Sequence, residues 1–168
     1  MAERTIVLDG FSKTFAMTGW RLGYAVVPPS LRETFGELII NTISCAPTFA
    51  QLGAIEALTG PQTDVEAMVR EFRVRRDLVV DGLNAIPGIE CRRPVGAFYA
   101  FPSVAGTGLS GIELAHRLLD EAGVCVLAGS GFGPHGDDHI RISYATSREN
   151  LVEALARIRA FVAGIVRG

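Results

Sequence analysis

The sequence predicts an α/β fold, and three observations support this prediction. Short β-branched apolar runs alternate with longer amphipathic segments along the whole chain. Ser or Thr precedes several of the amphipathic segments, and Gly or Pro follows them, as at the ends of helices. Apolar residues make up 48% of the 168 residues, which is enough for a packed core and argues against disorder.

The first 60 residues predict two strands and then two helices. The apolar runs at residues 5–8 and 22–27 have the composition of buried strands. Ser30 is expected to cap a helix that continues to about residue 43, and a further helix is expected to follow Pro47 and continue to about residue 58.

The remaining residues predict three helices and three strands. Capping boxes begin helices at Thr63 and Ser110, and Ser147 is expected to cap the last helix. Gly123 should end the middle helix. The expected strands are residues 96–101, 124–127 and 139–144. The last helix carries an apolar seam, formed by Leu151, Leu155, Ile158, Val162 and Ile165.

Composition excludes several classes of function. The 16 basic and 18 acidic residues are interspersed and give a net charge of -2, so we expect neither nucleic-acid binding nor membrane binding. Cys45, Cys91 and Cys125 lie far apart, which predicts small buried hydrophobic residues in a reducing compartment and no zinc site. The charged N-terminus does not have the pattern of a signal peptide, so the expected location is the cytoplasm.

Lys13 is the most informative single residue. The chain has 15 arginines and this one lysine. A lysine amine can act as a nucleophile or form an imine, which a guanidinium cannot do. Neighbouring Phe11, Phe15 and Trp20 predict a partly desolvated amine. Arg21 follows eight residues later between two glycines, where a phosphate could approach its guanidinium. From these residues alone, a surface lysine and an ordinary arginine ion pair remain as alternatives.

The run from Ser12 to Tyr24, SKTFAMTGWRLGY, closely resembles the cofactor-lysine motif of class I/II aminotransferases, the aspartate-aminotransferase-like enzymes of fold type I. Four further blocks resemble the same family in the same order. They are residues 44–51, 94–102, 129–133 and 140–145. Five blocks in family order make coincidence very improbable.

This resemblance implies a pyridoxal 5'-phosphate enzyme that transfers an amino group between an amino acid and a 2-oxo acid, as a homodimer when intact. It implies that Lys13 forms an imine bond with the cofactor and that Arg21 holds the cofactor phosphate. Arg141 would pair with the carboxylate of the substrate. Ser12 and Gly10 would complete the phosphate contacts; many relatives have serine at the position of Gly10.

Two other functions remain open at this point. The same scaffold supports lyases and synthases, and a catalytically dead chain is also compatible with these residues. A dinucleotide fingerprint at Gly129–Gly133 is set aside because its spacing is wrong. A metal site at His135–His139 is set aside because such a turn is more often a solvated hairpin tip.

The resemblance covers only the C-terminal part of a family chain. It implies that residues 1–60 are a remnant of the large cofactor-binding domain and that residues 61–168 are a connecting helix and the α+β small domain. The residues that stack on the cofactor ring and pair with its nitrogen would lie outside this sequence. We therefore expect the isolated chain to be inactive.

Overall fold

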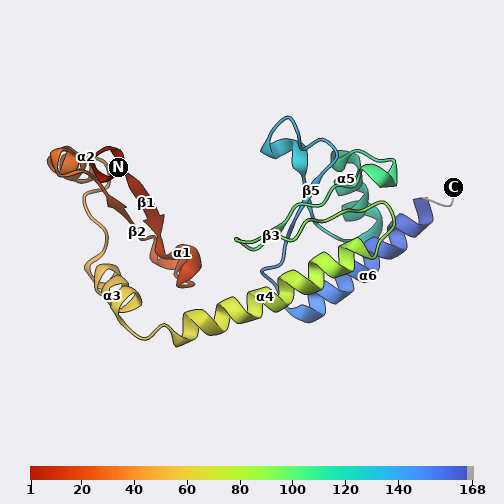
Figure 1. Cartoon of the computed structure of the whole chain (residues 1–168), viewed down its shortest axis with the longest axis horizontal. Helices are drawn as coiled ribbons and strands as arrows, with labels where there is room; N and C mark the ends of the chain where they lie inside the picture. Colours follow the sequence, from red (N-terminus) through yellow and green to blue (C-terminus); the bar gives the residue numbers. More distant parts are fainter. Residues whose placement is uncertain (166–168) are drawn as a thin grey trace. The chain divides into compact units, whose positions relative to one another are not determined.

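A computed structural model describes residues 1–165 of the chain. The chain divides into two compact units, Met1–Ala67 and Met68–Gly168. Helix α4, Thr63–Asn84, begins in the first unit and continues into the second (Figure 1).

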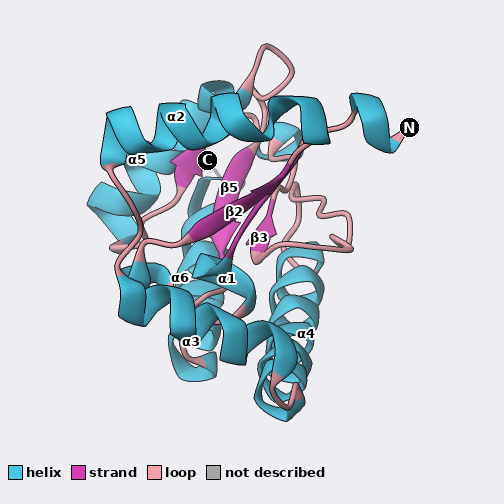
Figure 2. Cartoon of the chain, turned by 90° about the vertical axis from the view of Figure 1, so that its left-hand side faces the viewer, coloured by secondary structure: helices cyan, strands magenta, loops and turns pink. Residues whose placement is uncertain are grey.

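The first unit is built on an antiparallel pair of strands. The pair consists of β1, Val7–Gly10, and β2, Gly23–Val26, with Gly10 opposite Gly23. No other described strand pairs with either of them. The helices of this unit are α1 (Phe11–Thr14), α2 (Arg32–Ile43) and α3 (Thr48–Thr59). Figure 2 shows α2 and α3 on opposite sides of this ribbon.

Two boundaries in the first unit differ from the sequence prediction. The first strand starts at Val7 and continues through Gly10. It includes Gly10 because this glycine pairs closely with Gly23 of the second strand. A Cβ atom on Gly23 would lie 3.0 Å from the Asp9 carbonyl oxygen. The cap predicted at Ser30 is wrong. This residue lies inside a 3-10 turn, Pro29–Leu31, and α2 starts only at Arg32. Pro29 fixes the backbone in a conformation that suits the start of such a turn.

The second unit combines three helices with a small sheet. Its short strands β3 (Tyr99–Ala100), β4 (Leu127–Ala128) and β5 (Ile140–Ser143) are antiparallel, with β5 in the centre. Helices α5 (Gly111–Ala122) and α6 (Arg148–Ile165) follow α4 in the chain. Gly82 of α4 faces Leu155 of α6 so closely that a Cβ atom would lie 2.5 Å from the leucine side chain.

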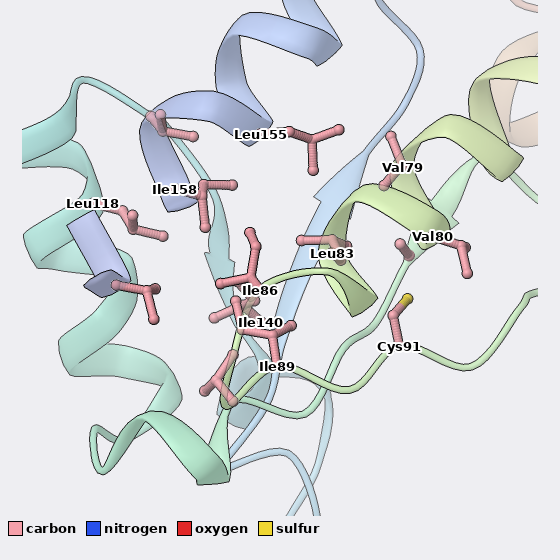
Figure 3. Close-up of a cluster of buried hydrophobic side chains, with 14 of the residues drawn as sticks. Val79, Val80, Leu83, Ile86, Ile89, Cys91, Leu118, Ile140, Leu155 and Ile158 are labelled. Atoms are coloured by element: carbon pink, nitrogen blue, oxygen red, sulfur yellow. The ribbon is translucent and has the colours of Figure 1, made fainter. Parts of the chain in front are cut away.

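The core of the second unit lies between these helices and the sheet (Figure 3). Its most deeply buried members include Leu83 at 0% exposure, Ile140 at 0% and Ile158 at 1%. The predicted seam of the last helix is confirmed, because its first four members are buried while Ile165 is half-buried. Burial of this apolar surface is the main source of stability for the unit.

Several predicted features of the second unit are confirmed and others are wrong. The Ser110 hydroxyl accepts from the Glu113 amide at 3.3 Å, and Gly123 ends α5 in the left-handed conformation with φ of 63°. The strand predicted at residues 96–101 is only two residues long, and the strand predicted at 124–127 begins at Leu127. Pairing with β5 sets both lengths, which local composition does not encode.

The cysteine prediction is confirmed only in part. Cys91 is buried, and this burial raises the pKa of its thiol. Cys45 and Cys125 are exposed in the described chain, so the prediction of burial is wrong for both. Among the helices of residues 1–165, none is long and apolar enough to cross a membrane.

Candidate active site

Lys13 lies on the connection between β1 and β2. Helix α1 follows β1 directly, and the Phe11 amide donates to the Leu22 carbonyl at 3.2 Å, which closes the base of this loop. The Lys13 side chain is exposed. The apolar setting expected for Lys13 is therefore not formed by the described residues, and Phe11 packs instead in a cluster with Met17 and Ala54.

Helix α3 holds the loop in place. Phe11 and Met17 are 3% and 8% exposed, and both pack with Ala54 of α3. Trp20 lies on Gly53, where a Cβ atom would come within 2.6 Å of the indole ring. The apolar residues around Lys13 thus anchor the loop, while the Lys13 side chain remains exposed.

Arg21 has a left-handed backbone, with φ of 51°, which is uncommon for a residue other than glycine. Its Nη1 atom donates to the Thr18 carbonyl at 2.9 Å. Among the described residues, no carboxylate forms an ion pair with Arg21 or with Lys13. The predicted alternative of an ordinary ion pair is therefore not supported for Arg21.

The Gly10 amide is already engaged. It donates to Oδ1 of Asp9 at 2.7 Å, and the Tyr24 hydroxyl donates to Oδ2 of the same carboxylate at 3.3 Å. The negative charge of Asp9 raises the pKa of Tyr24, and partial burial and the hydrogen bond act in the same direction. The Gly10 amide would thus reach a phosphate only if Asp9 released it. Ser12 is half-buried on α1 beside Lys13.

Arg141 lies in the second unit, on the central strand β5. Its guanidinium carbon is 4.4 Å from the ring centroid of Tyr99 and 4.5 Å from that of Phe132. The side chain is half-buried, and none of the ion pairs of residues 1–165 includes it. An arginine held by aromatic rings keeps its hydrogen-bond donors available to an added carboxylate.

The sequence alone did not predict Tyr99 and Phe132 as partners of Arg141. A signal for the first of them was present. Tyr99 pairs with Ser143, two residues from Arg141 on the same face of the strand, so the two side chains are diagonal neighbours. No comparable signal marked Phe132, which lies on the 3-10 turn Gly129–Phe132.

The glycine-rich turn and the histidine turn support the sheet. The Gly129 amide donates to the His139 carbonyl at 2.8 Å, which ties the turn to the start of β5. The ring of His139 stacks on Phe101, with centroids 5.1 Å apart, and its Nδ1 lies 2.7 Å from Asp138. His139 is half-buried, so the predicted solvated hairpin tip is wrong for this residue. No metal-binding group of three His, Cys, Asp or Glu side chains exists within residues 1–165.

The candidate residues therefore form two sets. Gly10, Ser12, Lys13 and Arg21 share one loop of the first unit. Arg141 belongs to the second unit with its aromatic partners. Each set is a cationic site on an α/β scaffold, suited to an anionic ligand.

The fold of this chain is similar to that of solved aminotransferase structures. The chain superposes on the crystal structure of an aromatic aminotransferase from Pyrococcus horikoshii OT3 with a TM-score of 0.93 and 42% identity, over 98% of this chain and 44% of that one. The fold is thus that of the fold type I aminotransferases. The family described as Aminotransferase class I and II matches residues 1–158, and the chain belongs to this family.

Relatives support the same conclusion. A provisionally named Bacillus subtilis (strain 168) aminotransferase, YugH, is 49% identical over 96% of this chain and 42% of its own length. The aspartate aminotransferase of Pyrococcus horikoshii is 44% identical over 96% of this chain and 42% of its own length. The chain therefore spans less than half the length of these relatives.

The residues of the first unit fit the cofactor that this family generally uses, pyridoxal phosphate. The groups that support this fit lie on one loop: the primary amine of Lys13, and the guanidinium of Arg21, which no described carboxylate pairs with. An amine suits the aldehyde of the cofactor, and a guanidinium suits its phosphate.

Proposed function

We propose that this chain supplies the cofactor lysine, the phosphate arginine and the carboxylate arginine of a pyridoxal-phosphate-dependent aminotransferase. The observation that carries the proposal is the loop between β1 and β2. It presents the single lysine of the chain and an arginine that no described carboxylate neutralises. Apolar contacts with α3 anchor this loop, and Arg21 adds one hydrogen bond to the Thr18 carbonyl within it.

Each residue of the loop has a separate role in this proposal. Lys13 binds the cofactor through its amine and, once released from it, moves a proton at the substrate Cα atom. Arg21 and Ser12 bind the phosphate, and the Gly10 amide joins them when Asp9 releases it. Bound pyridoxal phosphate supplies an electron sink for the charge that develops at Cα.

Arg141 is proposed to bind the α-carboxylate that the amino acid and the 2-oxo acid share. Its guanidinium offers two parallel N–H groups, which match the two oxygens of a carboxylate. The absence of a described carboxylate partner supports this role, since a guanidinium committed to an ion pair would have to exchange partners first.

The whole enzyme requires more than this chain in our proposal. Residues 1–60 would belong to the large domain and residues 61–168 to the connecting helix and the small domain. Contacts to the cofactor ring come from outside the 168 residues, so the isolated chain binds the cofactor weakly and is inactive. The active form is proposed to be a cytoplasmic homodimer.

A labelling experiment tests the role of Lys13 and Arg21 directly. The 168-residue chain is titrated with pyridoxal phosphate, reduced with borohydride and mapped by mass spectrometry. Because Lys13 is the only lysine, the N-terminal amine is an internal control for unspecific labelling. We expect saturable labelling at Lys13. Arg21→Gln should weaken it about tenfold or more, since a charged hydrogen bond contributes about 1.5–3 kcal/mol.

Matched variants complete this experiment. Arg32→Gln removes an exposed arginine at the start of α2 and should leave labelling unchanged. Pyridoxal, which lacks the phosphate, should label Lys13 equally in the wild type and in Arg21→Gln. Equal labelling of the two proteins by pyridoxal phosphate would contradict the proposed phosphate site.

A further inference from the structure

We infer that Tyr99 and Phe132 are positioning residues, which hold the guanidinium of Arg141 in the orientation that binds a substrate carboxylate. This inference rests on the proposed function, in which Arg141 is the carboxylate ligand. It adds two residues to which the family resemblance described above assigned no individual role. We call Tyr99, Phe132 and Arg141 together the arginine clamp.

The clamp is defined by two ring contacts on one cation. Both ring centroids lie within 4.5 Å of the guanidinium carbon, close enough for a cation–π contact. The two rings come from different elements, since Tyr99 belongs to β3 and Phe132 to the turn after β4. Contacts from two elements restrict the motion of the arginine more than either contact alone.

The chain also fixes Phe132 itself. Phe101 meets the Phe132 ring edge-on, with centroids 6.0 Å apart and an interplanar angle of 90°. The turn that carries Phe132 is closed by Gly129 and Gly136, because a Cβ atom on Gly136 would lie 2.1 Å from the Gly129 carbonyl oxygen. Phe132 is nevertheless 52% exposed, so its position does not arise from burial in the core.

The consequence for binding is one of preorganisation. A free arginine side chain loses several rotatable bonds when it grips a ligand, and this loss weakens binding. Arg141 has already lost much of this freedom, and rings attract the cation without occupying its N–H donors. A carboxylate can therefore add to an arginine that is held in place and still fully charged.

The test follows the Nε–Hε resonance of Arg141 by NMR in the 168-residue chain. Wild-type protein should show a narrow resonance, shifted by the rings, that moves saturably when propionate is added. Phe132→Leu and Tyr99→Leu should each raise the dissociation constant for propionate about three- to tenfold, the size expected for one lost ring contact. Phe132→Tyr, which keeps a ring, should restore binding to within about twofold of the wild type.

Phe161→Leu is the matched control. It removes the ring beneath a different arginine, Arg117, whose guanidinium carbon is 5.0 Å from the Phe161 centroid. It should leave propionate binding unchanged. Phe132→Leu binding propionate as well as the wild type would overturn the clamp and leave the role of Arg141 intact. If the Arg141 resonance of the wild type did not shift when propionate is added, both the clamp and the proposed carboxylate-binding role of Arg141 would be overturned. The labelling of Lys13 tests the proposed cofactor site independently of this result.

Discussion

Both units of this chain contain many apolar residues, but only the second unit packs them into a large core. The second unit encloses an apolar core between three helices and a sheet. The first unit buries only Phe11, Met17 and Ala54 in its cluster. Its larger apolar side chains remain exposed, among them Leu8 at 73% and Ile43 at 68%. Apolar composition therefore does not make a core by itself, because nearly all residues of the two-stranded ribbon in the first unit stay exposed.

Hydrogen exchange should separate the two units most clearly. Amides of α5 and α6, such as that of Leu118, should open only with global unfolding of the second unit. Amides of the β1–β2 pair, such as that of Tyr24, should exchange orders of magnitude faster, because local opening there exposes little additional apolar surface. Mass-spectrometric or NMR exchange rates measure both. Equal protection of the two units would refute the comparison.

A pair of leucine variants tests the same difference between the units through the free energy of unfolding. Leu83→Ala removes a side chain with 0% exposure from the core of the second unit and should cost about 2–5 kcal/mol of unfolding free energy. Leu38→Ala removes a side chain with 57% exposure from α2 and should cost about 0.5 kcal/mol or less. Urea denaturation gives both values. The second unit would not be the stable part of the chain if the two costs were similar.

The smallest expected effect concerns the ion pair that joins α4 to α6. Glu71 accepts from Arg148 and from Arg75, and these bonds lower the pKa of its carboxyl to about 2. A carboxyl with a lowered pKa stabilises the folded state above its usual value near 4.5, and this contribution disappears as the pH falls toward 2. Stability of the wild type should thus decline more than that of Glu71→Gln across this range.

Urea unfolding between pH 5 and pH 2 provides the measurement. The difference in unfolding free energy between the wild type and Glu71→Gln should be present at pH 5 and shrink toward pH 2. Asp120→Asn changes an exposed carboxyl on α5 and serves as the control. A difference that did not depend on pH would mean that Glu71 acts by packing and not by charge.

Much of the helical structure could be predicted because its signals are local. The cap at Ser110 and the stop at Gly123 depend on residues within one turn of the helix. Strand limits were less predictable. Residues 96–101 have the composition of a strand, but only Tyr99 and Ala100 find partners on β5. Ser30 failed as a cap because Pro29 starts a 3-10 turn ahead of the helix.

The candidate site was predictable only as a set of residues. Lys13 and Arg21 stood out because they are the single lysine and an arginine between glycines, and the resemblance assigned their roles. Their surroundings were not predictable. Aromatic neighbours in sequence suggested a desolvated Lys13, whereas Phe11 and Met17 face α3. Phe132 reaches Arg141 only through the tertiary course of a turn, which no spacing in the sequence encodes.

The ribbon of β1 and β2 has a consequence for how this chain behaves in concentrated solution. Both of its outer edges carry backbone groups that no described strand occupies, and Val26 beside one edge is 58% exposed. Such an edge is a template on which a strand from another molecule can align and extend the sheet. Self-association through this ribbon would therefore increase with protein concentration. Purification at low protein concentration should preserve the solubility of the chain.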